Sequence, residues 1–461
     1  MAASLTQLLN TARDSLSAQT YGLGVTGQNL ANVNTPGYVR REALLETRAL
    51  GTQTTGSVVA NGIRRVTDEF LERRQFESTG LNSAASEHDS RLESLEALFN
   101  DVSGTGLGNS LDNLYNSFTQ LSANPADPTT RRNVLAAADA FAERSRDTAT
   151  VIAQSRTDLL KDAQSTTTQI NESARAIARL NSQILAAEAQ GGDAADLKDQ
   201  RKQVMLGLAS LVDVRTIASG SGIVVQASGT TLVDGVEARQ LSIDLDSDGK
   251  MRVFAARNDE ATPTEVTKFL TGGKLAGIKE ARDVDLFETA KKLDEFVFDV
   301  ATSINQQHQL GFGTDGVDGR DLFDVNTADA ARTVRVSVDV FNRPEAIAAS
   351  GSATTLPGGT DNAVALSRLS TAPVVFGNSR TAAQSYGDLV GDVGQRKSAA
   401  EKMLESREAI AAQLDAMNEA MSGVSLDEEF VNLTKFQRAY EASARVLTTA
   451  DQLLQELIQR V

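Results

Sequence analysis

Both ends of this chain carry an apolar repeat with a seven-residue period, which is typical of a helix packed along one side against another helix. Near the N-terminus the repeat consists of Leu9, Leu16, Leu23 and Leu30. At the other end it consists of Leu426, Phe430, Leu433, Tyr440, Leu447, Leu454 and Ile458. The predicted C-terminal helix has about 36 residues, is over 50 Å long and needs a partner along its length. We therefore expect the two terminal helices to pair with each other.

The C-terminal helix has a predicted start after Gly423. Ser425 followed three residues later by Glu428 fits a capping box, in which each side chain binds a backbone N–H of the other.

A second row on the N-terminal helix is made of small residues: Ser17, Thr20, Gly24, Gly27 and Ala31. Each helical glycine costs roughly 1 kcal/mol relative to alanine, so the row needs a compensating reason. We interpret it as a groove where another backbone packs closely. Gly22, Gly24 and Gly27 also fit G-x-G-x-x-G, but a nucleotide site needs a strand before the glycines and a helix after them. Neither is predicted here.

Between the ends the periodicity predicts an α+β fold that is mainly α. Helical patterns cover about 81–100, 109–122, 131–190 and 196–212, with Asp127 as N-cap and Pro128 as first residue of the long run. We divide the chain into an inner terminal-helix domain (1–38 plus 424–461), a helical middle domain (39–212 plus 272–310 plus 386–423), a β-hairpin-rich region (213–271) and a variable outer loop and β region (311–385).

Alternating apolar residues predict strands from about Asp213, joined by Asp-Gly and Ser-Gly turns. In one of these turns Asp244, Asp246, Asp248 and Gly249 imitate the first half of a calcium loop. The twelfth position is alanine and the flanks are strand-like, so we interpret the segment as a hairpin turn. Within the outer region, "ARTVRVSVDV" (331–340) has a strand pattern.

Composition restricts the possible chemistry. The chain has no cysteine, and its two histidines, His88 and His308, are interpreted as a solvated helix residue and a polar residue near a loop. The net charge of −16 and the lack of basic clusters argue against nucleic acid and anionic lipid. No signal peptide and no membrane span are recognised. We expect no cofactor, no metal, no nucleic acid, no membrane insertion and no enzymatic activity, and proteins as partners.

Apolar periodicity that is strongest at the chain ends indicates assembly, because two paired helices cannot cover all of their own apolar and small-residue surface. Heterologous contacts would repeat into a ring, a tube or a filament.

The segment "GQNLANVNTPGYVRRE" resembles the N-terminal signature of the bacterial flagellar rod, hook and hook-associated proteins. The matching positions are Ala31, Asn32, Asn34, Thr35, Pro36, Gly37 and Tyr38. The last segment, from "SGVSLDEEF" onward, is similar to the C-terminal helix of that family. Further stretches, among them "ANPADPTTRRNVL" and "GGKLAGIKEARD", resemble the hook-associated members at the junction between hook and filament.

The resemblance implies a structural subunit of that junction, needed for flagellum assembly and motility. It implies an extracellular location reached by type III export without a cleaved signal peptide. The implied partners are further copies of the chain, the hook protein, the second hook-filament junction protein and a flagellar export chaperone. Two alternatives stay open: a hook or distal rod subunit, and a wall-degrading enzyme using acidic residues of 244–248 or 313–321.

Two further expectations concern the inner domain. We expect Pro36, Gly37 and Tyr38 to form the joint between the inner and middle layers. We also expect residues 1 to about 35 and 425–461 to be disordered or chaperone-bound in the monomer, because isolated amphipathic ends are marginally stable in water.

Overall fold

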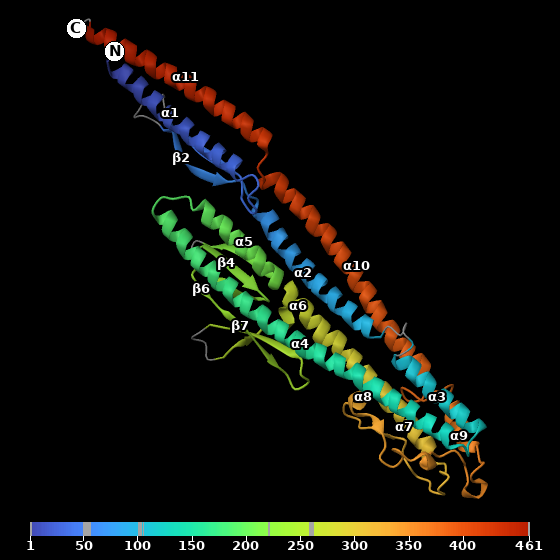
Figure 1. Cartoon of the computed structure of the whole chain (residues 1–461). Helices are drawn as coiled ribbons and strands as arrows, with labels where there is room; N and C mark the ends of the chain where they lie inside the picture. Colours follow the sequence, from blue (N-terminus) through green and yellow to red (C-terminus); the bar gives the residue numbers. More distant parts are fainter. Residues whose placement is uncertain are drawn as a thin grey trace.

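The computed structural model describes residues 2–48, 57–99, 104, 106–219, 222–257 and 262–459. It is a long rod with both chain termini at one end, built mainly from helices that run along its length (Figure 1). The predicted α+β fold, mainly α, is confirmed.

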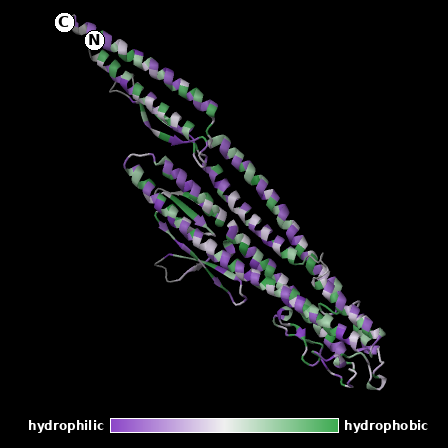
Figure 2. Cartoon of the chain, viewed as in Figure 1, coloured by the Kyte–Doolittle hydropathy of each residue, from purple (hydrophilic) through white to green (hydrophobic). Residues whose placement is uncertain are grey.

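The terminal helices α1 (Ala2–Ala31) and α11 (Leu426–Gln459) lie side by side at one end of the rod, as predicted (Figure 1). They are separate from the broad apolar core that fills the body of the molecule. Figure 2 shows apolar and polar residues alternating along both helices. The inner pair is thus a narrow two-helix layer rather than part of a globular core.

A β-hairpin that the sequence analysis did not predict packs against α1. Its strands are β1 (Arg41–Arg48) and β2 (Ser57–Arg65), paired antiparallel with a bulge after Leu44. Residues 39–65 were placed in the helical middle domain with no strand predicted there, but the chain returns along α1 before it enters the first body helix. The strand signal was weak because β1 carries charged residues at both ends.

The body contains the long helices. Helix α2 (Glu69–Leu98) packs along α10 (Ala382–Ser422), and α4 (Pro128–Ala189) lies against α3 (Leu107–Ala123) and α5 (Ala195–Leu211). The N-cap prediction is confirmed, because Asp127 accepts hydrogen bonds from the backbone N–H groups of Thr129 and Thr130. This cap fixes the start of a 62-residue helix.

Helices α6 (Gly273–Glu280) and α7 (Leu286–Gln309) are joined by a π-helical turn, Ala281–Asp285. Gly277 faces α2 so closely that a Cβ atom would lie 2.5 Å from the Ala84 carbonyl oxygen. Glycine is therefore required for this helix contact.

The predicted β region is confirmed as two antiparallel sheets beside α4. One has the order β3 (Val214–Ser219), β4 (Gly222–Ala227), β5 (Thr230–Asp234), β6 (Glu237–Ala238); the other has β7 (Gln240–Leu245), β8 (Met251–Ala256), β9 (Thr264–Glu265). The calcium-like segment is the β7–β8 hairpin turn: Asp246 accepts from the backbone N–H groups of Asp248 and Lys250, and Gly249 has φ +70°.

The outer region is mostly irregular. It holds β10 (Phe323–Asp324), α8 (Ala330–Thr333), β11 (Arg335–Val336) and α9 (Asp361–Arg368). The strand expected over 331–340 is wrong except for two residues, because Ser337 begins a turn whose carbonyl accepts from Val340 and Phe341. The strand that forms, Arg335–Val336, pairs with Phe323–Asp324.

His308 contacts the backbone of two loops, in agreement with the expectation of a polar residue near a loop. Its side chain is fully buried at the end of α7, where Nδ1 lies 2.7 Å from the Arg320 carbonyl oxygen and Nε2 accepts from Ala348 N. Burial lowers the pKa of His308 to about 4. His88 is partly exposed on α2 and lies 2.6 Å from an Asp285 oxygen.

Candidate functional site

The joint between the inner helices and the body is organised around the buried side-chain amide of Asn29, near the end of α1. Its Nδ2 donates to the Arg41 carbonyl (2.8 Å) and to Glu429 (3.1 Å). Its Oδ1 accepts from Tyr38 Oη (2.9 Å) and from Arg41 N (3.0 Å). Both donors and both acceptor positions of the amide are used. One side chain therefore connects α1, the chain leaving it, and α11.

Arg40 ties the same segment to the start of α11. Its guanidinium pairs with Glu428 (2.8 Å) and Glu429 (2.9 Å), and its backbone N–H donates to the Ser422 carbonyl at the end of α10. The capping box is confirmed only in its first half: Glu428 N lies 3.5 Å from Ser425 Oγ. The Glu428 carboxylate binds Arg40 instead, so the first turn of α11 is connected to the segment that leaves α1.

Arg41 and Arg65 link the hairpin to α5. Arg41 pairs with Asp196 (2.5 Å) and Asp199 (3.1 Å), and Arg65 pairs with Asp199 (2.7 Å). Burial alone would lower the pKa of Arg41, but its hydrogen bonds to the two aspartates raise it. The Arg41 guanidinium also lies 4.8 Å from the centre of the Tyr38 ring. Arg41 and Asp199 are largely buried, so this pair of opposite charges resists separation, whereas the side chain of Asp196 is exposed.

The residues that match the family signature, all within 31–38, run from the last residue of α1 toward β1 and form part of this joint. Asn32 closes the end of α1 by accepting from Thr35 Oγ1 and donating to the Gln28 carbonyl. Gly37 has φ +79°, and a Cβ atom there would collide with the side chain of Gln203. The side chains of the other motif residues, Ala31, Asn34 and Pro36, are exposed. The turn therefore depends on Asn32, Thr35, Gly37 and Tyr38, while the remaining positions face outward.

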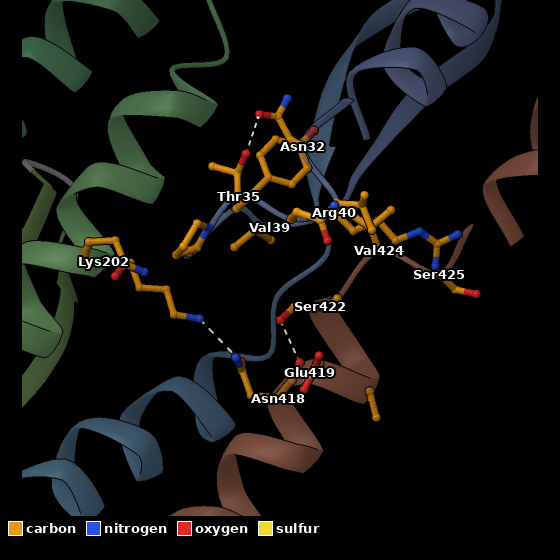
Figure 3. Close-up of a pocket in the computed structure, with 18 of the residues that line it drawn as sticks. Asn32, Thr35, Val39, Arg40, Lys202, Asn418, Glu419, Ser422, Val424 and Ser425 are labelled. Atoms are coloured by element: carbon orange, nitrogen blue, oxygen red, sulfur yellow. Dashed lines mark hydrogen bonds between the residues drawn. The ribbon is translucent and has the colours of Figure 1, made fainter. Parts of the chain in front are cut away.

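A cavity of about 710 Å³ opens beside the turn (Figure 3). Its wall contains residues 32–40 on one side and the α10–α11 link, 418–425, on the other. Lys202 reaches across from α5, with Nζ 3.4 Å from Asn418 Oδ1 and 3.2 Å from Glu72 Oε1. The joint thus has fixed polar connections around an open space, and its lining offers hydrogen-bonding groups rather than an apolar pocket.

The seam between α1 and α11 differs from the predicted rows. Small or polar side chains occupy its centre: Ser15 and Ser443 hydroxyls lie 2.8 Å apart, Ala18 and Ala450 are fully buried, and a Cβ atom on Gly22 would lie 2.5 Å from the Phe436 ring. The predicted residues lie beside the centre. Seven of the predicted seam residues are half-buried: Leu9, Leu16, Leu23, Leu30, Leu433, Leu447 and Leu454.

The remaining predicted residues of α11 lie outside the pair. Leu426, Phe430 and Tyr440 are exposed, and the side chain of Ile458 lies outside the described residues. The helices approach each other through small residues and through Phe436, which lies against Gly22, while most of their other large apolar side chains lie on the flanks. That arrangement leaves apolar surface for further contacts.

The predicted glycine groove has no occupant among the described residues. Gly24 and Gly27 are exposed, and a Cβ atom added to either glycine would have no neighbouring atom within 4 Å. Gly24 borders a groove of about 980 Å³ between α1 and β2. A role of this row in close packing therefore requires another molecule and stays a prediction.

Two of the acidic residues considered for wall hydrolysis form hydrogen bonds and an ion pair with neighbouring residues in their own turns. Asp246 closes the hairpin turn, and Asp315 binds Arg320 (2.6 Å) and accepts from Val317 N. Among the described residues no cluster of metal-binding side chains is found, and none of the described helices is apolar and long enough to cross a membrane.

Two family models match the chain. The model described as "Flagellar hook-associated protein FlgK helical domain" matches residues 92–323, and "Flagellar basal body rod FlgEFG protein C-terminal" matches residues 419–460. Flagellar hook-associated protein 1 of Bacillus subtilis is 27% identical, with 98% of this chain and 97% of the relative covered. The protein of the same name from Salmonella typhimurium is 26% identical, with coverage of 98% and 100%.

A solved structure, that of the flagellar hook junction protein FlgK from Burkholderia pseudomallei, has a similar fold. Its TM-score is 0.68 at 16% identity, and the match covers 76% of this chain and all of that one.

Paired terminal helices, a helical body and a polar joint between them define a structural subunit of the flagellar axis. The chain belongs to the flagellar hook-associated protein FlgK family. The predicted family and the structural role at the hook-filament junction, outside the cell, are confirmed. It is not an enzyme, and it assembles into the flagellum with hook components.

Proposed function

We propose that copies of this chain form a closed ring or a helical layer of the flagellar axis, with the α1–α11 pair on the inside and the body outside. The observation that carries this proposal is the narrow seam between the two helices. It leaves Leu426, Phe430 and Tyr440 exposed on one helix and Gly24 and Gly27 exposed on the other. Neighbouring copies would bury these surfaces.

In this proposal the layer contacts the hook protein on one side and the second hook-filament junction protein on the other. The joint sets the angle between inner pair and body, because Asn29, Arg40 and Arg41 connect α1, α11, the hairpin and α5 through hydrogen bonds and ion pairs. A subunit that adapts one packing to another needs a defined angle here.

We further propose that an export chaperone covers the apolar terminal helices before assembly. Exposed large apolar side chains on a free helix pair favour aggregation, and binding by another protein would prevent it.

The experiment replaces Gly37 with valine in cells that lack the native gene. The side chain is strained at φ +79° and collides with Gln203, so the joint changes while the distant body helices keep their packing. We expect native-like circular dichroism of the purified variant, with little of it incorporated at the hook tip and reduced swimming.

The matched control is Gly316→Val, because Gly316 has φ +75° but lies in the outer region with open space around it. If the Gly37 variant swims normally and is incorporated at the level of this control, the joint does not have the proposed role.

A further inference from the structure

The outward face of α10 carries three parallel rows of exposed residues, each with the spacing of a helix edge. The first row is apolar: Met403, Ile410, Met417 and Met421, between 43% and 50% exposed. The second row, in the middle, consists of Lys402, Ser406, Ala409, Gln413, Ala416 and Ala420. The third row is acidic: Glu401, Glu405, Glu408, Asp415 and Glu419.

The contact with α2 uses the half-buried residues Leu404, Ala411 and Leu414. Of the residues in the three rows, Asp415 accepts a hydrogen bond from Gln75 of α2 (2.8 Å). Three of the six methionines of the chain are exposed on this one helix face. Methionine adapts to varied surfaces, and the small side chains of the middle row let a second helix approach closely. The face therefore fits a helix that is apolar along one edge and cationic along the other.

The outward face of α11 has that chemistry. Val431, Lys435, Arg438, Ala442 and Arg445 follow one another at intervals of three or four residues, and Val446 and Leu453 lie beside them; all are exposed. In the described part of the chain no ion pair involves the following residues: Glu405, Glu408, Lys435, Arg438 and Arg445. Their charges are available to a partner.

We propose that α11 of one copy docks on the outward face of α10 of a second copy, with its cations against the acidic row and with Val446 and Leu453 against the methionine row. This inference deepens the proposed function and rests on it. The segments match in length: Met403 to Met421 spans ~27 Å and Val431 to Leu453 ~33 Å at about 1.5 Å per residue.

The two faces belong to consecutive helices of the same rod, joined through residues 423–425, and cannot meet within one copy (Figure 1). A contact between different surfaces of identical copies is heterologous, so each copy leaves one α10 face and one α11 face free for the next. A single contact type therefore repeats along the axis and closes only if the rotation between copies allows it.

Site-specific cross-linking tests the contact directly, because the chain has no native cysteine. Cells co-produce two differently tagged variants, Ser406→Cys on α10 and Ala442→Cys on α11, and isolated hook-filament complexes are treated with a short bismaleimide. We expect mixed dimers carrying both tags. The matched control pairs Ala442→Cys with Ser165→Cys, an exposed position on α4.

Mixed dimers no more abundant than in this control, or cross-links of Ala442→Cys only to the hook protein, would overturn the docking of one copy on another.

Charge exchange gives a second, independent measurement. Glu405→Lys with Glu408→Lys, or Arg438→Glu with Arg445→Glu, should each reduce the chain retained in isolated complexes about tenfold, since attraction becomes repulsion. The variant with all four changes should regain retention, because opposite charges face each other again. Circular dichroism confirms that each variant is folded.

The outcomes separate the two proposals. If isolated complexes retain every charge variant as well as they retain the unaltered chain, this docking surface is rejected and the proposed function is not affected. Absence of the unaltered chain from the complexes would reject both.

Discussion

At the residue scale, the joint depends most on Asn29, a residue that is not among the matching positions of the family signature. In the sequence it is one polar residue among several at the end of a helix. Its burial arises because Tyr38, Arg41 and Glu429 close around it, and Glu429 is 400 positions away. Local periodicity carries no information about such a contact, whereas the glycine of the turn could be predicted from the motif.

Replacing Asn29 with alanine should weaken the joint by about 1 to 3 kcal/mol per subunit, because buried groups of Arg41 and Glu429 lose their partner. The measurement is the guanidinium concentration at which isolated junctions release the chain. We expect a clear decrease for this variant. Asn34→Ala is the matched control, since Asn34 belongs to the motif but is exposed. Equal release of both variants would contradict the assigned role of Asn29.

His308 predicts a pH dependence of the body. Burial lowers its pKa to about 4 from the usual 6.5, so the unfolded chain takes up a proton at a higher pH than the folded chain. Its contribution to folding stability is therefore fully present above about pH 6.5 and decreases as the pH falls toward 4. The expected loss is about 3 kcal/mol for a shift of this size.

The test compares urea unfolding of the unaltered chain and His308→Gln between pH 7 and pH 4. The difference between their unfolding free energies should change across this range, because other titrating groups, such as Asp213 with its pKa raised by burial to about 6, are common to both. A difference that is constant with pH would contradict the assignment.

At the element scale, the terminal helices were predictable and their contact was not. The seven-residue repeat correctly indicated that α1 and α11 pair. It selected the largest apolar residues, however, while the seam is centred on small ones such as Ala18, Gly22 and Ala450. A seven-residue repeat marks every apolar surface of a helix, so it does not distinguish the contact within the chain from surfaces that other molecules cover. The hairpin β1–β2 was missed because charged residues at both ends of β1 obscure the strand pattern.

The glycine row of α1 gives a prediction in which stability and assembly change in opposite directions. Gly27→Leu should increase the helical content of the purified chain, since glycine costs roughly 1 kcal/mol in a helix and the position is open. It should decrease incorporation into flagella, because the added side chain blocks close approach of a neighbour. Far-UV circular dichroism and quantification of the chain in isolated flagella measure the two effects.

Gly207→Leu serves as the control, because Gly207 is an exposed helical glycine of α5 with open space around it. Equal incorporation of both leucine variants would show that the row does not contact a neighbour.

At the scale of the whole molecule, the order of the chain was readable from sequence: helices toward both ends, hairpins in the centre, and termini that meet. Asp127, the long α4 and the β7–β8 turn all obey local rules. The outer region follows no such rule, since buried residues such as Arg131 and His308 hold it through backbone carbonyls and N–H groups of loops. Such contacts depend on the complete fold.

The rod also predicts a difference between free and assembled chain. The inner pair has a narrow seam and is far from the main core, so we expect residues 1–35 and 425–461 to exchange amide hydrogens rapidly in dilute monomer and slowly in isolated flagella. The body helices should be protected in both states. Strong protection of both terminal segments in the dilute monomer would contradict this expectation.

The central claim is that this chain is a structural subunit at one level of the flagellar axis. Its most direct test is immunogold electron microscopy of isolated hook-basal bodies with attached filaments, using an antibody against residues 215–265. The account predicts a narrow band of label at the boundary between hook and filament. Label along the whole hook, or no label on the axis, would contradict it.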